Sequence, residues 1–294
     1  MAQVLAVGVA VVDHVFVVDE YPGEDVEMRA AAYSVRCGGN AATTLMVLSQ
    51  LGHRCALAAV LADAPEATPI ERALERHAVD TGPSRRCAGV PPPTSCVLVH
   101  PGAGTRTIVH HRSLPEFGCA DFERLDPAAY DWLHFEGRNV AELVPMLDRA
   151  HARNPRAVRS VEIEKPRPGI EAAYGRADWL LFSRAYARAC GQEDPAEFLR
   201  TVRPLAPRAH LVCAWGAQGA AGLAPDGRAV RVPAAAVPRA VDTLGAGDVF
   251  NAGVIDAGLR GLGLRDTLAW GCRLAGAKCG REGIEGLARA CDRP

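Results

Sequence analysis

The sequence has no excess of charge of either sign and no N-terminal apolar run long enough to cross a membrane. Its 33 Lys and Arg residues are balanced by 34 Asp and Glu, so the basic surface that nonspecific nucleic-acid binding requires is missing. The apolar stretch Val4–Val12 is too short for a membrane span and is followed by Asp13 rather than by a cleavage site. We therefore expect a cytoplasmic protein that acts on small molecules, with neither nucleic acid nor membrane as a partner.

The sequence also lacks a Cys-x-x-Cys pair, although it contains ten cysteines. These are spread over the whole chain and no signal peptide precedes them, which argues against the disulfide framework of a small secreted protein. Cys272 and Cys279 lie about two turns apart on an expected helix, a spacing that does not suit structural zinc. We expect reduced, mostly buried thiols.

Neither a fixed-period repeat nor a linker divides the 294 residues, of which 49% are hydrophobic. Such a chain can bury one large core. Short apolar runs alternate with helical patterns, which predicts a mainly parallel sheet covered by helices on both faces. We expect strands at Val4–Val12, Arg54–Leu61, Trp132–Phe135, Val158–Ile163, Trp179–Phe182 and His210–Trp215, a hairpin of Ala221–Ala224 with Ala229–Val232, and helices at Asn40–Leu51, Val140–Ala152, Ala246–Leu259 and Leu264–Cys279.

Two stretches depart from this alternation and predict a small separate sheet. Cys96–His100 and Thr105–His110 flank a glycine-containing turn, which is typical of a hairpin. His14–Asp19 could pair with Met28–Tyr33 in the same way. We expect these four segments to form one small sheet.

The segment Asp242–Asp248 reads Asp-Thr-Leu-Gly-Ala-Gly-Asp and leads directly into a helical pattern. Gly245 and Gly247 allow the backbone to approach a ligand closely, and the N–H groups and dipole of a helix start favour an anion. Beside such a site, Asp248 could act as a general base in phosphoryl transfer. Alternatively, Asp248 only complements the helix dipole at a tight turn, and the local sequence leaves the two interpretations evenly balanced.

Two other positions carry weaker signals. Gly38-Gly39-Asn40 opens an expected helix, and the Asn40 amide could donate to and accept from the hydroxyls of a polyol; the alternative is a helix N-cap. Asp13 follows an apolar strand, where open α/β sheets bind ligands, although a turn-forming aspartate has the same position. Taken singly, both positions favour the structural alternative.

Together, these residues resemble the signatures of the ribokinase-like (PfkB) carbohydrate kinases. Asp242–Asp248 matches the C-terminal signature, and Gly38–Asn40 with Asp13 matches the N-terminal one. The resemblance covers nearly the whole chain and is strongest to the ketose-phosphorylating branch of the family. The stretches that carry it are residues 19–29, 105–115, 134–139, 160–167, 212–215 and 241–252.

The resemblance implies an architecture. Residues 1–294 would form one kinase domain, a three-layer α/β/α body with a mainly parallel sheet. Segments of about 14–33 and 96–110 would form a β-sheet lid that clasps a second subunit. The expected small sheet falls where this lid would be.

The resemblance also implies a role for each matched residue. Asp248 would deprotonate the primary hydroxyl of the sugar, beside an anion hole formed by Gly245, Ala246 and Gly247. The sugar would be bound by Asp13, Gly39, Asn40 and Thr43, and Asp25 would reach the sugar of the partner subunit. The nucleotide would be bound by Arg106, Gly216, Ala217, Gln218, Gly219 and Cys272.

Two features depart from family patterns. Thr43 stands where the ketose-phosphorylating branch has Asn, and a hydroxyl is shorter than an amide and offers one donor rather than two. We hypothesise that Thr43 weakens or redirects fructose binding without abolishing phosphoryl transfer. The Asn-x-x-Glu motif that many members use around magnesium is absent, as it is in that branch, so the magnesium ligands are unknown, with Glu162 and Glu164 as candidates acting through water.

We predict an enzyme that uses ATP and Mg²⁺ to convert D-fructose to fructose 1-phosphate and that forms a homodimer through its lid. Potassium dependence stays open. One alternative is a kinase of the same family for another sugar or for a nucleoside. Another is a catalytically silent sugar- or nucleotide-binding protein, and a scaffold or metal-storage protein ranks last.

Overall fold

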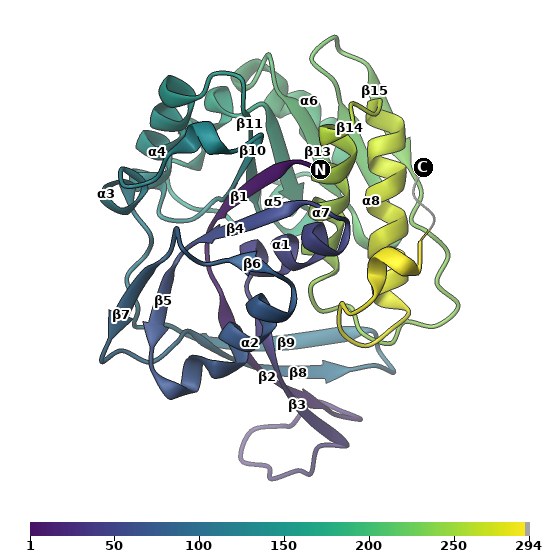
Figure 1. Ribbon diagram of the computed structural model, residues 1–294. Helices are drawn as coiled ribbons and strands as arrows, with labels where there is room; N and C mark the ends of the chain where they lie inside the picture. The colour runs from purple at the N-terminus through teal and green to yellow at the C-terminus, as the bar shows by residue number, and fades with distance from the viewer. Residues whose placement is uncertain (292–294) are drawn as a thin grey trace.

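The computed structural model describes residues 1–291, within which a nine-stranded sheet forms the centre of the molecule (Figure 1). Its strand order is β15, β14, β13, β12, β11, β10, β1, β4, β6. Neighbours from β13 to β6 are parallel, and β14 and β15 add antiparallel strands at one edge. The strands are β1 Gln3–Val7, β4 Arg54–Ala58, β6 Val79–Asp80, β10 Trp132–Glu136, β11 Val158–Ile163, β12 Trp179–Ser183, β13 His210–Ala214, β14 Ala220–Leu223 and β15 Ala229–Val232.

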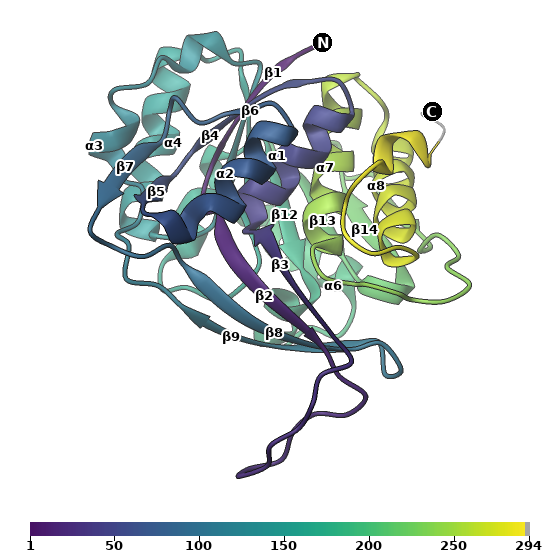
Figure 2. The same ribbon diagram turned by 60° about the horizontal axis from the view of Figure 1, so that its bottom comes forward.

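Helices cover both faces of this sheet, as expected (Figures 1 and 2). Val4 and Ala6 of β1 join a core with α1, α2, α7 and α8, whereas Leu5 and Val7 join a second core with α3 to α6. Because both faces are buried, every position of a central strand favours an apolar residue. The helices are α1 Asn40–Gln50, α2 Thr68–Arg76, α3 Cys119–Phe122, α4 Val140–Arg153, α5 Arg184–Ala189, α6 Pro195–Val202, α7 Ala246–Leu259 and α8 Leu264–Cys279, with 3-10 turns η1 Pro65–Ala67, η2 Pro127–Ala129, η3 Ile170–Arg176, η4 Arg203–Leu205, η5 Gly216–Gln218 and η6 Leu287–Arg289.

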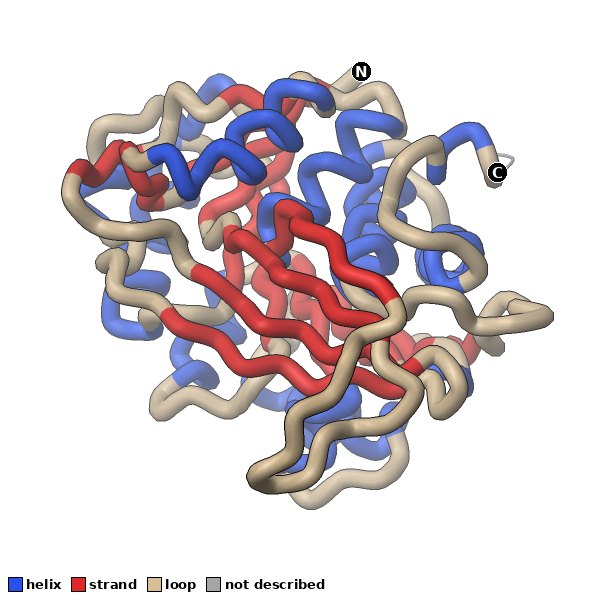
Figure 3. Tube along the Cα trace, turned by 90° about the horizontal axis from the view of Figure 1, so that it is seen from below, coloured by secondary structure: helices blue, strands red, loops and turns tan. Residues whose placement is uncertain are grey.

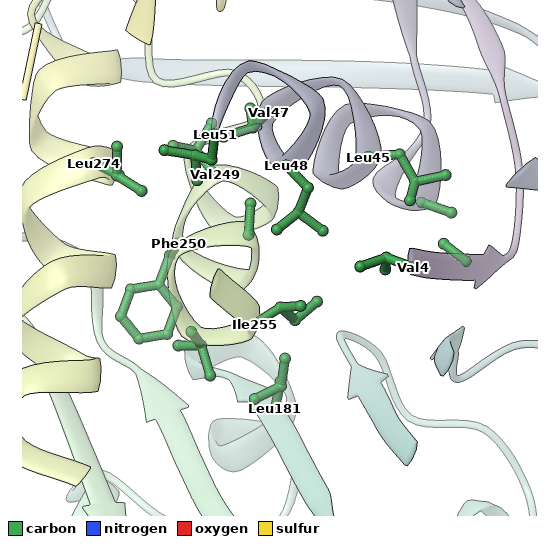
Figure 4. Close-up of a cluster of buried hydrophobic side chains, with 14 of the residues drawn as sticks. Val4, Leu45, Val47, Leu48, Leu51, Leu181, Val249, Phe250, Ile255 and Leu274 are labelled. Carbon is green, nitrogen blue, oxygen red and sulfur yellow. The ribbon is translucent and has the colours of Figure 1, made fainter. Parts of the chain in front are cut away.

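The packing of α1 against α7 places two glycine-rich helix starts near each other. Leu48 of α1, Val249 and Ile255 of α7 and Leu274 of α8 are fully buried in one cluster (Figure 4). Burying such a side chain contributes about 1.5–3 kcal/mol. A hydrogen bond of 3.3 Å from the Thr44 hydroxyl to the backbone oxygen of Asp248 adds to this packing. The helix starts at Asn40 and Ala246 are therefore held by one core.

A separate four-stranded sheet lies across one end of the body, in the order β3, β2, β8, β9 (Figure 3). It confirms the expected small sheet, including the hairpin of β8 with β9. Another small sheet pairs β5 with β7. The strands are β2 Val11–Val17, β3 Ala32–Gly38, β8 Thr94–His100, β9 Thr105–His111, β5 Val60–Asp63 and β7 Arg85–Ala88.

The single strand predicted at Val4–Val12 is wrong. The chain leaves the central sheet after Val7, and Val11 begins β2 of the four-stranded sheet. The connecting residues Val9 and Ala10 are buried as well, so no polar position marks the break. The single strand predicted at Arg54–Leu61 divides at Ala59 into β4 and β5 for the same reason.

The predicted pairing around Pro22-Gly23 is correct, but its limits are not. β2 pairs with β3, and the last pair is Val17 with Ala32. The predicted segment Met28–Tyr33 therefore lies mostly in the loop of residues 18–31, which projects from the body (Figure 2).

Within residues 1–291, no helix has both the length and the apolar composition that crossing a membrane requires.

Candidate active site

A cavity of about 1690 Å³ lies between the four-stranded sheet and the starts of α1 and α7. Residues that are distant in the sequence meet on its wall, including most of those singled out above. They are Asp13, Gly39, Asn40, Thr43, Arg106, Gly216, Ala217, Gly219, Gly245, Ala246, Gly247, Asp248 and Cys272.

The first turn of α7 brings unpaired backbone donors to the cavity wall. Gly245 precedes the helix with φ of 77°, a left-handed conformation that favours glycine. Within residues 1–291, the N–H groups of Gly247 and Asp248 have no protein acceptor, as is usual in a first helical turn. Together with the helix dipole, these donors suit an anion such as a phosphoryl group.

Asp248 lies in the same turn and is partly exposed to the cavity. Burial raises the pKa of its carboxyl group well above the ordinary value, and the negative charges of Glu162, Glu164 and Glu136 raise it further, while Arg106 partly opposes them. A carboxylate with a raised pKa is a stronger proton acceptor. The environment of Asp248 is therefore suited to general-base chemistry.

Glu162 gives the cavity a buried carboxylate with spare acceptor capacity. Its Oε1 atom accepts a hydrogen bond of 3.0 Å from the Asn251 amide, whereas its Oε2 atom has no partner among the described residues. Burial and the charges of Glu136 and Glu164 raise the pKa of Glu162 to about 8. A positive charge would relieve this repulsion, because an opposite charge nearby favours the ionised form.

Asp13 lies inside β2 and not at the end of a central strand, so its predicted position is corrected by the break after Val7. Its side chain is buried, and a Cβ atom on Gly38 would lie only 2.0 Å from its Oδ2 atom. Burial raises the pKa of Asp13 to about 6, although a hydrogen bond with Ser95 and the nearby charge of Arg36 oppose the rise. Glycine at position 38 leaves the space that this carboxylate occupies.

The Gly-Gly-Asn segment turns the chain from β3 into α1. Gly39 has φ of 97°, and a Cβ atom there would lie 2.3 Å from the backbone oxygen of Val9. Gly39 occupies the N-cap position, so Asn40 is not the cap, and its side-chain amide lies 3.4 Å from Oε2 of Glu164. Thr43 is buried one turn later. Asn40 and Thr43 therefore lie on the same face of α1.

The residues expected near the nucleotide come from three separate elements. Arg106 lies on the exposed strand β9, Gly216 and Ala217 belong to η5 after β13, and Cys272 is buried on α8. Gln218, which was expected near the nucleotide, is exposed beside the cavity and does not line its wall.

Asp25, which was expected to reach the sugar of the partner subunit, does not line the cavity either. It lies on the projecting loop with φ of 58°.

Sequence reasoning missed Glu136, the last residue of β10. Its Oε1 atom accepts hydrogen bonds from the backbone N–H groups of Val9 (2.9 Å) and Ala41 (2.8 Å). It thereby connects the turn between β1 and β2 to the start of α1. The signal was present, because an acidic residue directly after the predicted strand Trp132–Phe135 stands where parallel strands place functional groups.

Comparison of the sequence with known proteins shows which family the chain belongs to. The model of the pfkB family carbohydrate kinases matches residues 1–289. The chain is 39% identical over 293 residues to ketohexokinase of Mus musculus, covering 97% of this chain and 98% of the mouse protein.

Solved structures agree on the fold. A candidate ribokinase from Agrobacterium tumefaciens has a TM-score of 0.86 at 24% identity, covering 98% of this chain and 94% of that one. Ribokinase of Arabidopsis thaliana, complexed with ribose and ATP, has a TM-score of 0.79 at 16% identity, covering 96% and 94%. The chain therefore belongs to the pfkB family and is an ATP-dependent carbohydrate kinase.

Proposed function

We propose that this kinase transfers the γ-phosphoryl group of ATP to the 1-hydroxyl of D-fructose, giving fructose 1-phosphate. One observation carries the proposal: a carboxylate of raised pKa, Asp248, stands beside unpaired backbone donors on a cavity that also contains the buried acceptor Asp13. The 39% identity to mouse ketohexokinase over almost the full chain supports a ketose as the acceptor.

In the proposed reaction, Asp248 accepts the proton of the sugar hydroxyl as its oxygen bonds to the γ-phosphorus. The bond from the γ-phosphorus to the bridging oxygen breaks, and ADP leaves with that oxygen. The backbone of Gly245, Ala246 and Gly247 would form the anion hole, in which the unpaired N–H groups of Gly247 and Asp248 would stabilise the charge on the transferred group, because the N–H of Ala246 already donates to the Thr243 oxygen. Arg106 would pair with phosphate oxygens as a fixed cation.

The sugar would lie between the four-stranded sheet and α1. Asp13 and Asn40 would bind its hydroxyl groups, because a carboxylate accepts while an amide both donates and accepts. Gly39 would allow a close approach of the backbone. Thr43 would stand beside the reacting end of the sugar, since it borders both Asn40 and the anion hole.

Magnesium would accompany ATP, and the acidic cluster fits it. Mg²⁺ prefers oxygen ligands and keeps several waters, and the unpartnered Oε2 atom of Glu162 offers such a ligand. Within residues 1–291, no group of three His, Cys, Asp or Glu side chains encloses a metal site. We propose that Glu162 and Glu164 hold the ion through water, where it would neutralise charge on the phosphates.

The four-stranded sheet would act as the lid of the site and as the contact with a second copy. Val15 and Val97 are buried on the side that faces the body. On the opposite side, one row of neighbouring residues runs across the four strands. It consists of Val35, His14, Cys96 and Val109. Val109 is 69% exposed. An apolar outer face of this kind suits a partner sheet. Asp25, on the projecting loop, would then reach the partner's sugar.

The test is an ADP-release assay with a panel of sugars and nucleosides, with ³¹P NMR to locate the phosphate. We expect the highest kcat/KM for fructose, with phosphate at carbon 1. Thr43 makes another family substrate the specific rival, and a preference for ribose or adenosine would overturn the proposal. Sugar binding with equally negligible turnover in wild type and Asp248→Asn would instead indicate a silent binding protein.

A further inference from the structure

Asp242 opens the glycine motif, yet the proposed mechanism gives it no role. Its side chain is buried in the loop that leads to α7. Both carboxylate oxygens are fully engaged. Oδ1 accepts from the N–H of Leu244 (2.9 Å), and Oδ2 accepts from Arg36 (2.8 Å), Lys278 (2.9 Å) and the N–H of Gly283 (3.1 Å).

Lys278 is an unusual partner because it is a lysine with only 1% of its surface exposed. Its ammonium also donates a hydrogen bond of 2.9 Å to the backbone oxygen of Asp242. A buried charge is unfavourable unless it is paired and hydrogen-bonded. Here a single ammonium group binds both the side chain and the main chain of the residue that begins the motif.

The carboxylate of Asp242 is held in its ionised form, and its charge and hydrogen bond oppose the lowering of the Lys278 pKa by burial. Burial alone would raise the pKa of Asp242, but the charge and hydrogen bond of Lys278, with the N–H groups of Leu244 and Gly283, bring that pKa below its ordinary value. Lys278 also lies in the last turn of α8, where a cation is favoured by the helix dipole. The ion pair therefore anchors the loop to the end of α8.

Arg36 extends this anchor to the other side of the cavity. It lies on β3, directly before Cys37 and the Gly38-Gly39-Asn40 turn, and its guanidinium bridges Asp242 and Glu282 at 2.8 and 2.6 Å. The strand that leads to the sugar-binding turn and the loop that leads to the anion hole are thus joined through one carboxylate.

We propose that Lys278 is a positioning residue that holds the loop of Asp242 so that the donors of Gly247 and Asp248 meet the transferred phosphoryl group, and that Arg36 fixes this loop relative to β3. The inference rests on the proposed phosphoryl transfer. Preorganised donors act only when they are fixed in place, and a misplacement of about 1 Å can cost about 10²-fold in rate.

The first experiment removes the ammonium and returns it. Lys278→Ala deletes the atoms of n-propylamine from the side chain, so added n-propylamine can refill the space. We expect kcat to fall at least about tenfold while the KM for fructose changes little, and n-propylamine to restore much of kcat. The neutral analogue n-propanol should not restore it. Arg265→Met, which removes an exposed cation from the same helix, should leave kcat unchanged.

A second variant tests whether a loss of kcat could come from a loss of folding. Lys278→Met combined with Asp242→Asn removes both charges of the buried pair, which is tolerated far better than removing one partner, and Arg36 keeps its ion pair with Glu282. We expect this variant to melt near the wild-type temperature and still to lose at least about tenfold in kcat. Wild-type kcat in the folded double variant, or rescue by n-propanol as well as by the amine, would overturn the positioning role.

A binding measurement separates this inference from the proposed function. Calorimetry would compare the affinities for AMP-PNP and ADP, because of the two only AMP-PNP carries a γ-phosphoryl group. We expect Lys278→Ala to weaken AMP-PNP binding selectively and n-propylamine to restore it. A wild type that phosphorylates no sugar would refute the proposed function, whereas an unchanged affinity ratio in Lys278→Ala would refute the role of Lys278.

Discussion

The Cγ2 methyl of Thr43 lies 3.4 Å from the position that a Cβ atom on Gly245 would occupy. Thr43, the fourth residue of α1, thus packs against the glycine that precedes the proposed anion hole. A change of side chain at position 43 is expected to alter sugar binding and also to alter the packing at the start of α7. The two glycine motifs form one wall of the cavity rather than two independent sites.

Thr43→Asn should lower the KM for fructose. An amide is longer than a hydroxyl and offers a second donor, and one additional hydrogen bond contributes about 0.5–1.5 kcal/mol, which corresponds to a decrease of about 2- to 10-fold. Steady-state kinetics with fructose and ribose would measure the change. Thr43→Val is the matched control, because it keeps the shape and removes the hydroxyl. An unchanged KM in Thr43→Asn would contradict a role of residue 43 in sugar choice.

Asp248→Asn should abolish most of the turnover and leave sugar binding intact. A general base contributes about 10²- to 10⁴-fold, so we expect kcat to fall within that range. The variant should also be at least as stable as wild type near pH 8, because it removes a carboxylate whose burial opposes ionisation. Asp266→Asn, an exposed acid on α8, serves as the control. Retention of most of kcat in Asp248→Asn would exclude Asp248 as the base.

Asp13→Asn should stabilise the ligand-free protein in a pH-dependent manner. The pKa of Asp13 rises from 3.8 to about 6 on folding, so between these values the folded chain keeps a proton that the unfolded chain has lost. Stability therefore falls as the pH rises through this window and stays lower above it. At pH 8 the variant should gain up to about 3 kcal/mol in its free energy of unfolding.

Urea unfolding of wild type and Asp13→Asn at pH 4 and pH 8 measures this difference. The gain should be small at pH 4, where Asp13 is protonated in the folded protein. The other buried acids titrate equally in both proteins and cancel in the comparison. An equal gain at both pH values would show that packing, and not ionisation, is responsible.

Chelation of Mg²⁺ with EDTA should abolish turnover. Glu162→Gln should raise the Mg²⁺ concentration needed for half-maximal activity by about 10-fold or more, because this is the usual effect of losing a group that orients a metal. Gln keeps the size of the side chain and its contact with Asn251. Glu171→Gln, an exposed acid on η3, is the control. An unchanged Mg²⁺ dependence in Glu162→Gln would place the ion elsewhere.

Val109→Lys should dissociate the proposed dimer. Val109 is 69% exposed on the outer face of the four-stranded sheet, and a charge there would have to be buried against the partner. Light scattering after size exclusion should give a dimer for wild type and a monomer for the variant. Leu205→Lys alters a comparably exposed apolar residue of the body (54%) and should leave the dimer intact. A monomeric wild type would contradict the clasp.

The sequence by itself determined the features that depend on neighbouring residues. Helix α7 begins and ends at the predicted Ala246 and Leu259, because the glycine before it and its apolar pattern are local signals. Burial of the parallel strands on both faces is equally local, since it makes each run apolar. The motif residues and the family resemblance likewise required only the order of residues along the chain.

Tertiary structure alone decided which apolar run is divided between two sheets and which charges meet. Nothing near Val9 marks the passage from β1 to β2, because both strands are buried. The partners of Asp242 come from β3 and α8, 206 positions before it and 36 after it, and the pKa of Asp248 depends on glutamates from β10, β11 and the loop that follows. Charges interact through space and burial sets their strength, so no local pattern could have shown that Lys278 and Arg36 share one carboxylate.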